Sequence, residues 1–276
     1  MLTYTTYSEA GGVGKTTLSA NLARAHSDHG HRVLVIDLDP QDGCFSYLLG
    51  VDDHRSDESI DTLVHHLIDR GDDFGDLIHT REGIDIVPSH NMLERLGDLL
   101  EKAASIAEQT GESFSKYGRL RHVLAANDVP EKYDVLIVDP PATSGPHLYN
   151  AIDATRSLVI PVEPSGKGGE SITGLESVVS GIESNLDIDV GVLATVVNRF
   201  EGTNDQQAVL DEVSAMPYSN PVTLRKRSSL FEGCWAQQCS AFEYVEKHRD
   251  REREHERETL DKLDDLATYL EERGDL

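Results

Sequence analysis

The segment 7–17, YSEAGGVGKTT, combines residue types that suit phosphate binding. Its glycines let backbone N–H groups approach a phosphate closely, and the positive end of a following helix dipole adds to the attraction. Lys15 supplies a charge for the β- and γ-phosphates, and the Thr16 hydroxyl suits Mg²⁺. The strict pattern G-x-x-x-x-G-K-[ST] requires glycine where this chain has Glu9, but residues 11–16 keep the core of the pattern. The segment therefore predicts nucleotide binding.

Three aspartates end two apolar runs that are predicted as strands. Asp37 and Asp39 lie in VIDLDPQ, and Asp139 ends LIVD in LIVDPP. Attack on a γ-phosphate needs a group that positions water, and Mg²⁺ needs acidic groups around its ligands. A single aspartate at a strand end also suits capping of the next turn. Three of them around a phosphate loop favour a Mg-nucleotide site.

These residues need a scaffold that brings strand ends together. Apolar runs predict strands at residues 2–7, 32–39, 83–89, 133–141, 157–164 and 187–200. Helical patterns lie between them, at residues 16–29, 58–70, 91–109, 116–127, 168–184 and 204–214. The alternation predicts an α/β fold, a doubly wound and mostly parallel sheet with helices on both faces. Ligands of such sheets bind at the carboxyl ends of the strands, where the residues above fall.

The domain organisation is predicted to be simple. No internal repeat or low-complexity linker interrupts the sequence, so we expect a single domain over residues 1–276. Residues 241–272 predict a C-terminal charged helix packed on it, with apolar residues at helical spacing toward the core. The charge run 246–258 is interpreted as a solvated face, with a partner-binding helix as the alternative.

Acidic residues outnumber basic ones, with 50 Asp+Glu against 25 Lys+Arg and a formal net charge of −25. Such a surface repels itself in dilute buffer, but it is screened at molar salt, where the Debye length is about 3 Å. This balance resembles proteins of halophiles that accumulate salt, and an ordinary acidic protein is the alternative. No apolar run of about 18 residues predicts a membrane span, and the first residues lack a signal-peptide pattern. We therefore expect a cytoplasmic protein.

The three cysteines do not form a recognisable metal or dithiol motif. Cys44, Cys234 and Cys239 lack the C-x-x-C spacing that zinc and dithiol sites use. We interpret Cys234 and Cys239 as small, buried or half-buried thiols, with a bridging iron–sulfur or metal site as the alternative.

Four segments carry a family resemblance. GGVGKTT, VLVIDLDPQ, YDVLIVDPP and VVNRF occur in the order and spacing of the ParA/MinD family of deviant P-loop ATPases. Residues 83–96 and 221–233 also resemble their family counterparts, so the likeness covers residues 1–245. The motif DLDPQ is similar to the ParA side of the family, which positions plasmids and chromosomes. Because the sequence begins at the ATPase strand, it resembles short ParA-like forms without a helix-turn-helix extension.

The resemblance implies an ATPase that binds Mg-ATP and forms a nucleotide-sandwich homodimer. It implies slow hydrolysis to ADP, stimulated by a ParB-like activator protein. The expected role is plasmid or chromosome partition or cargo positioning, with nucleoid association as a further expectation and no membrane partner. Mg²⁺ is the expected metal.

The resemblance also implies which residues hold the phosphates and the metal. The phosphates are expected to contact Gly11, Gly12, Val13, Gly14, Lys15, Thr16 and Thr17. Thr16 is the implied magnesium ligand, with Asp37 and Asp139 behind it.

Further roles follow from the same resemblance. Asp39 is implied to position the attacking water, so that Asp39 and Lys15 are the expected catalytic residues. Asn198 is expected to read the adenine edge, because an amide offers both a donor and an acceptor. Pro221 and Thr223 are expected to lie beside the base.

Position 10 departs from the family. Ala10 stands where the signature lysine reaches the phosphates of the partner subunit, and a trans cation of the arginine-finger type is worth about 10³–10⁵ in rate. An ATP-binding dimerisation switch with little or no hydrolysis is therefore an alternative function. Lys167, in EPSGKGGES (163–171), is a candidate replacement cation, and a solvated surface lysine is the alternative.

Two further questions concern partners. Arg225, Lys226 and Arg227, with Arg199 as a further candidate, are the residues expected to contact DNA non-specifically. Solvated side chains beside the base pocket are the alternative.

A MinD-like positioning ATPase is another alternative function, but that group ends in a basic amphipathic helix, whereas this sequence ends in the acidic LDDLATYLEERGDL. The three cysteines do not match the ligands of an iron–sulfur carrier.

Overall fold

The computed structural model describes residues 1–164, 179–251 and 253–276. Within them, eight strands form one sheet in the order β3-β4-β2-β5-β1-β6-β7-β8. All neighbouring strands are parallel except β3 and β4, which confirms the predicted doubly wound, mostly parallel sheet. The strands are β1 Leu2–Thr6, β2 Val33–Asp37, β3 His79–Arg81, β4 Ile84–Val87, β5 Val135–Asp139, β6 Ser157–Val162, β7 Gly191–Phe200 and β8 Thr223–Arg225.

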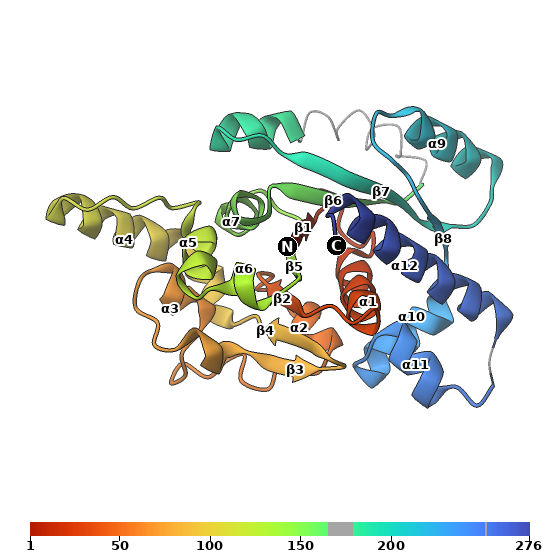
Figure 1. Ribbon diagram of the computed structural model, residues 1–276, viewed down its shortest axis with the longest axis horizontal. Helices are drawn as coiled ribbons and strands as arrows, with labels where there is room; N and C mark the ends of the chain where they lie inside the picture. The colour runs from red at the N-terminus through yellow and green to blue at the C-terminus, as the bar shows by residue number, and fades with distance from the viewer. Residues whose placement is uncertain (165–178, 252) are drawn as a thin grey trace.

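Helices cover both faces of the sheet (Figure 1). The α-helices are α1 Lys15–Asp28, α2 Phe45–Leu48, α3 Leu63–Leu67, α4 Leu96–Thr110, α5 Arg119–Ala126, α6 Val129–Lys132, α7 Pro146–Thr155, α9 Asn204–Ala215, α10 Ser228–Gln237, α11 Ala241–His248 and α12 Glu254–Arg273. The 3₁₀ helices of the described residues are η1 Phe74–Leu77 and η2 Asn91–Arg95. In the part of the chain that the structure describes, no helix has both the length and the apolar character needed to cross a bilayer.

The core forms on both sides of the sheet because the central strands are apolar at successive positions. Side chains alternate between the two faces of a strand. Val33 and Val35 of β2 pack with α1, α10 and α12 on one face. Leu34 and Ile36 pack with α3, α4 and α5 on the other. The continuous apolar runs of the sequence therefore produce a sheet with two covered faces.

The predicted helix over residues 58–70 is wrong in extent, since only α3 is α-helical there. The carboxylate of Asp61 accepts hydrogen bonds from the backbone N–H groups of Thr62 and Asp72 at 2.8 Å each. An aspartate that bonds local backbone groups competes with the helical hydrogen bonds. The prediction over 91–109 is closer, because η2 leads directly into α4.

The C-terminal segment 241–272 is two helices, not the single predicted one. Arg249 follows α11 in an extended conformation, and its Nε lies 3.0 Å from Glu256 Oε2 on α12. The Glu256 side chain is 1% exposed, and the Arg249 guanidinium lies over the Tyr244 ring. A buried charge needs such a partner. The charge run is therefore not wholly a solvated face, because it supplies the ion pair at this corner.

Helix α12 packs against α1 (Figure 1) and is joined to it by polar contacts. Glu271 Oε1 lies 2.6 Å from His26 Nδ1 and 2.9 Å from His29 Nδ1. His26 is fully buried, and its Nε2 lies 3.1 Å from the Tyr4 hydroxyl of β1. The last helix is thus fixed to the helix whose first residue is Lys15.

Candidate nucleotide-binding site

The loop after β1 leads directly into α1 and has the backbone that its glycines predict. Gly12 and Gly14 have φ angles of 79° and 93°, in the left-handed region that favours glycine. A Cβ atom on Gly14 would also lie 2.6 Å from Asn198 Nδ2. Gly11 and Ala10 are exposed, whereas the Val13 side chain is buried. The loop therefore presents its backbone at the surface and anchors itself through one apolar residue.

Thr16 and Asp139 come together as the sequence predicts. Asp139, the last residue of β5, accepts hydrogen bonds from Thr16 Oγ1 at 2.8 Å and from Ser19 Oγ at 2.7 Å. Burial, followed by the charge of Asp37, raises the pKa of Asp139 to about 7, against the effect of the two hydroxyl donors. The acid at the end of β5 is thus held against the first turn of α1.

Asp37 lies next to Asp139 in the register of β2 and β5 but is used differently. Its carboxylate accepts hydrogen bonds from the Ser46 N–H at 2.8 Å, the Ser46 hydroxyl at 2.6 Å and the Asp39 N–H at 3.0 Å. Burial raises its pKa to about 6. In this structure Thr16 bonds Asp139 and not Asp37. Asp37 therefore orders the segment that follows β2, which the sequence analysis did not foresee.

Asp39 and Lys15 lie within electrostatic reach of each other. Burial raises the pKa of Asp39, and a hydrogen bond from the Gln41 N–H and the charges of Lys15 and His147 oppose that rise. Burial lowers the pKa of Lys15, and the charges of Asp139 and Asp39 oppose that fall. Lys15 is only 9% exposed. The charge of Lys15 therefore acts on the carboxylates of both Asp39 and Asp139, so the two predicted catalytic residues influence each other.

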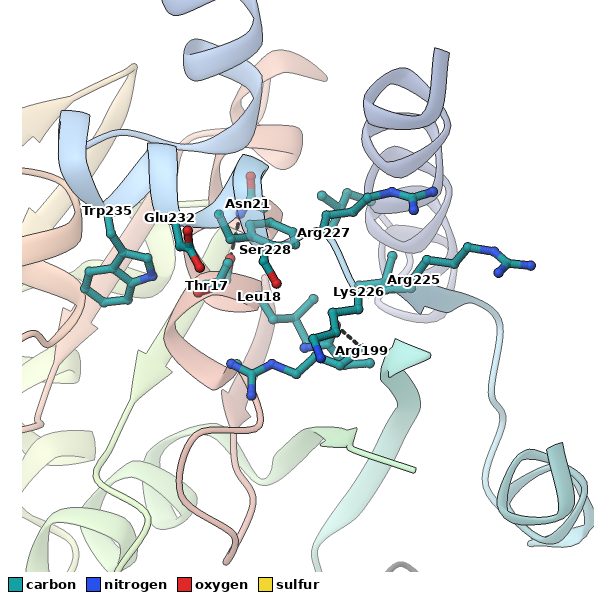
Figure 2. A pocket seen from close by; sticks show the side chains of 15 residues that line it. Thr17, Leu18, Asn21, Arg199, Arg225, Lys226, Arg227, Ser228, Glu232 and Trp235 are labelled. Atoms are coloured by element: carbon teal, nitrogen blue, oxygen red, sulfur yellow. Dashed lines mark hydrogen bonds between the residues drawn. The ribbon is translucent and has the colours of Figure 1, made fainter. Parts of the chain in front are cut away.

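A cavity of about 290 Å³ adjoins the loop (Figure 2). Its walls come from α1, the ends of β7 and β8, the segment after β8, and helices α10 and α12. The lining residues are Gly14, Thr17, Leu18, Asn21, Asn198, Arg199, Leu224, Arg225, Lys226, Arg227, Ser228, Phe231, Glu232, Trp235 and Leu263. Two predicted phosphate-loop residues and the predicted base reader thus share one cavity.

The Asn198 side chain holds the loop in this structure. Its Nδ2 donates to the Val13 carbonyl at 2.7 Å, and its Oδ1 accepts from the Arg199 N–H at 2.9 Å. Both polar groups of the amide therefore have backbone partners. Pro221 and Thr223 do not line the cavity; residues 224–228 do. That Pro221 and Thr223 lie beside the base stays a prediction.

The basic residues that are expected to contact DNA line the rim of this cavity and have acidic or aromatic neighbours. Lys226 Nζ lies 3.2 Å from Glu201, and Arg227 Nη2 lies 3.5 Å from Glu258 on α12. In Figure 2 the guanidinium groups of Arg225 and Arg227 point away from α1. The structure thus places all three beside the candidate base pocket.

The remaining predictions concern Lys167 and the three cysteines. The candidate replacement cation Lys167 lies outside the described residues. Cys44, Cys234 and Cys239 are free and buried, which confirms the interpretation of the last two as buried thiols. Among the residues that the structure describes, no group of three His, Cys, Asp or Glu side chains is arranged to hold a metal ion.

Comparisons with known proteins agree with this geometry. Residues 3–191 match the family model AAA_31, described as an AAA domain. The chain is 31% identical over 210 residues to the sporulation initiation inhibitor protein Soj of Bacillus subtilis, over 74% of this chain and 76% of Soj. The chain belongs to the Soj/ParA family of P-loop ATPases. It is also 30% identical over 194 residues to the chromosome-partitioning ATPase Soj of Thermus thermophilus, over 70% of this chain and 68% of that protein.

Solved structures show the same fold. McdA from Cyanothece, without nucleotide, has a TM-score of 0.74 at 22% identity and covers 98% of this chain and 99% of its own. The septum site-determining protein MinD of Pyrococcus horikoshii, in complex with Mg-ADP, has a TM-score of 0.69 at 20% identity and covers 95% and 94%. The likeness extends over nearly the whole length of each chain.

Some residues of this Soj/ParA-family site were not found from the sequence. Ser19 lies one helical turn after Thr16, on the same face of α1, so its spacing was a usable signal. Ser46 and His147 carry no such signal. They reach Asp37 and Asp39 only because α2 and α7 pack beside the ends of β2 and β5.

Proposed function

We propose that this chain binds Mg-ATP between the loop 11–17 and the adjoining cavity, hydrolyses it slowly, and acts as a switch in plasmid or chromosome partition or in cargo positioning. The observation that carries the proposal is the hydrogen bond from Thr16 to Asp139 beside the Lys15 ammonium. A loop hydroxyl, a strand-end acid and a lysine are the groups that Mg-nucleotide chemistry uses. The name of the Thermus relative, a chromosome-partitioning ATPase, supports the role.

The chemistry of these residues fits Mg²⁺. Thr16 donates its proton to Asp139, so the lone pairs of its oxygen are free to bind a cation. Asp37 and Asp139 form a neighbouring buried acidic pair, and Mg²⁺ in proteins is bound by few protein oxygens together with phosphates and water. Thr16 would hold the ion, with the two acids behind it. When bound, Mg²⁺ would neutralise charge on the β- and γ-phosphates.

The chain's own residues would divide the remaining work. The backbone N–H groups of Gly11, Gly12 and Gly14 would cradle the phosphates, as the positive φ angles of the last two allow. Lys15 would neutralise part of the phosphate charge. Asp39 would orient the attacking water, since its carboxylate is held by the Gln41 N–H at 2.9 Å.

Partners complete the proposal. The ATP-bound chain would pair with a second copy as a nucleotide-sandwich dimer, and a ParB-like protein would stimulate turnover. Arg225 and Lys226, which are exposed, would supply non-specific contacts to DNA phosphates and association with the nucleoid. Arg227 is the weakest DNA candidate, because its side chain is only 18% exposed and its Nε donates to the His255 carbonyl at 3.1 Å.

A second function is favoured by Ala10, which is exposed and carries no charge at the position of the family's signature lysine. In that case the chain binds ATP and dimerises but hydrolyses the ATP slowly or not at all. A MinD-like positioning role is the other alternative; α12 itself is acidic and is not the basic amphipathic helix through which such proteins dock on a membrane.

The test combines calorimetry of Mg-ATP binding with a phosphate-release assay and light scattering of the wild-type protein. Binding with ATP-dependent dimers and turnover supports the proposed ATPase switch. Binding and dimers without turnover support the non-hydrolysing switch. Absence of ATP binding overturns both.

We also propose that the net charge of −25 is an adaptation to high salt. The melting temperature should rise between about 0.1 and 2 M KCl, because salt shortens the Debye length to about 3 Å or less and screens the repulsion between carboxylates. Circular dichroism at each KCl concentration measures it. A melting temperature that stays constant or falls would favour an ordinary acidic protein.

A further inference from the structure

The loop between β2 and α2 carries Asp39 and is held from two sides. On the inner side, Ser89 Oγ donates to the Asp39 carbonyl at 2.6 Å, and the Asp39 N–H donates to Asp37 at 3.0 Å. These bonds fix the start of the loop to the ends of β2 and β4. They leave residues 40–44 to be held by other groups.

Arg55 holds the outer side. Its Nη1 donates to the Gln41 carbonyl at 2.7 Å, and its Nη2 donates to the Pro40 carbonyl. Its Nε donates to Asn91 Oδ1 at 2.8 Å. The side chain is 10% exposed. A guanidinium offers several N–H donors in one rigid plane, which a lysine ammonium does not, so one side chain can bond two successive carbonyls.

The backbone of Arg55 is anchored as well. Its carbonyl accepts from the Asn91 N–H at 3.0 Å, so main chain and side chain both bond the first residue of η2. Asn91 follows β4 closely in the chain. Arg55 therefore connects the loop to the framework of the sheet and does not move freely with the loop.

The Pro40 carbonyl and the Gln41 N–H belong to the same peptide unit, which is planar. Arg55 bonds the carbonyl at one edge of that plane, and the N–H at the opposite edge bonds Asp39 Oδ1 at 2.9 Å. Rotation of this plane would break both bonds together. The orientation of the Asp39 carboxylate is thus coupled to the Arg55 guanidinium through a single peptide.

We propose that Arg55 is a positioning residue for Asp39: it fixes the peptide between Pro40 and Gln41 and so aims the carboxylate that orients water. The proposal rests on the proposed ATPase function for its kinetic consequence. Its structural consequence, a loop that opens when Arg55 is removed, is independent of ATP turnover.

Cys44 provides a reporter for the structural consequence. Its Sγ lies 3.4 Å from Arg55 Nη1 and the residue is 2% exposed. Burial and the neighbouring Asp37 charge raise the pKa of the thiol to about 12. Because the thiolate is the nucleophile that attacks a disulfide reagent, Cys44 reacts slowly while the loop is closed. Cys234 and Cys239 are buried outside the loop and serve as internal controls.

The experiment compares the wild type with Arg55→Met, Arg55→Lys and the control Arg119→Met. Arg119 is buried to a similar extent as Arg55, since its side chain is 7% exposed, and it donates to the Leu67 carbonyl at 2.8 Å. Labelling with dithionitrobenzoate, located by peptide mass spectrometry, measures each thiol. In Arg55→Met we expect Cys44 to react at least about tenfold faster, as local opening gives access, with Cys234 and Cys239 unchanged. Arg119→Met should leave Cys44 unchanged.

Kinetics provide the second readout. In Arg55→Met we expect kcat to fall about 10- to 100-fold, the scale of a misplaced catalytic group, with the ATP Kd within about threefold of wild type. In an Asp39→Ala background the same change should have no further effect on kcat. Arg55→Lys keeps the charge but not the planar guanidinium, so its kcat should lie between those of the wild type and Arg55→Met. It also allows the test if Arg55→Met fails to fold.

The outcomes separate the two proposals. Unchanged Cys44 labelling in the Arg55 variants overturns the positioning role, whatever the turnover. A loop that opens while kcat is unchanged overturns it too. If the wild type binds ATP but shows no turnover, the hydrolysis proposal fails, and faster Cys44 labelling in Arg55→Met still supports the assignment of Arg55 to the loop.

Discussion

The phosphate end and the base end of the candidate site are built in different ways. The phosphate end uses consecutive residues, 11–17, together with the acids that end two adjacent central strands. The base end uses side chains from β7, the segment after β8, α10 and α12, which come together only through tertiary packing. A local motif thus specifies one half of the site, and the packing of the whole C-terminal part specifies the other.

The two ends also differ in charge and exposure. Lys15 and Asp139 are buried, and the Asp139 carboxylate accepts hydrogen bonds from the hydroxyl groups of Thr16 and Ser19. Lys226 at the base end is exposed, in an ion pair with Glu201, and exposed pairs contribute little. Substitutions at the phosphate end should therefore have much larger effects on ATP than substitutions of charges at the rim.

The largest effect is expected for Lys15→Ala. ATP affinity should fall roughly 10²- to 10³-fold, since an ammonium about 4 Å from a phosphate charge contributes on the order of 4 kcal/mol at an effective dielectric near 20. Calorimetry with Mg-ATP measures it. Lys226→Ala is the matched control at the base end and should change affinity less than about threefold, as exposed ion pairs do. Equal losses in the two variants would remove the distinction between the ends.

Asp39→Ala tests the phosphate end through rate instead of affinity. We expect kcat to fall about 10²- to 10⁴-fold, as for loss of a positioned acid–base group, while ATP binding and ATP-dependent dimers persist. Phosphate release and light scattering measure the two properties. Turnover at the wild-type level would assign the water-positioning role to another residue.

Asn198→Ala tests whether Asn198 supports the phosphate end or the base end of the site. Because its amide bonds the Val13 carbonyl of the loop, we expect ATP and inorganic tripolyphosphate to bind equally more weakly, by about tenfold, the scale of one lost buried hydrogen bond. Calorimetry with each ligand measures it. Trp235→Leu, on the cavity wall, should weaken ATP alone. Loss confined to ATP in Asn198→Ala would instead support adenine recognition.

The smallest effect is expected for His29→Ala, which loosens α12 and its contribution to the base end. Burial alone would lower the pKa of His29, but its contacts with Glu271 and Asp264 raise it above the usual 6.5. A raised folded-state pKa gives stability that is fully present below pH 6.5 and lost as pH rises through the folded pKa. The wild type should therefore melt about 2–4 °C above His29→Ala at pH 5.5 and by less at pH 8.5. An equal difference at both values would show that the charge of His29 is not involved.

The contrast between the ends explains what the sequence could predict. The glycines, Lys15, Thr16 and the strand-end acids lie in short motifs whose local geometry is set by backbone rules, so their assembly followed from the pattern of strands. The exception, Asp37, has the right position but bonds Ser46. Nothing in the spacing indicates that the segment after β2 folds back on it.

The base end was predicted less well because its residues depend on non-local packing. Pro221 and Thr223 were predicted from the resemblance of a segment, and the cavity wall is formed by residues 224–228, which follow them. The single helix predicted over 241–272 failed for a related reason. Its helical periodicity is real on both sides of the break, but the ion pair between Arg249 and Glu256 turns the chain there.

The position of β1 has a consequence for how this protein is made. The first strand in this sequence lies in the middle of the sheet, between β5 and β6, and its partners in the register are residues 135–138 and 158–159. A nascent chain on the ribosome therefore carries this threonine-rich strand without neighbours until β5 and β6 have emerged, and non-local parallel pairing of this kind is slow. During that interval the phosphate loop has no acid at Asp139 to hold its threonine. The phosphate loop can therefore reach its folded form only after β5 and β6, which end at Asp139 and Val162, have been synthesised, and chaperones that bind exposed strands have access to β1 until then.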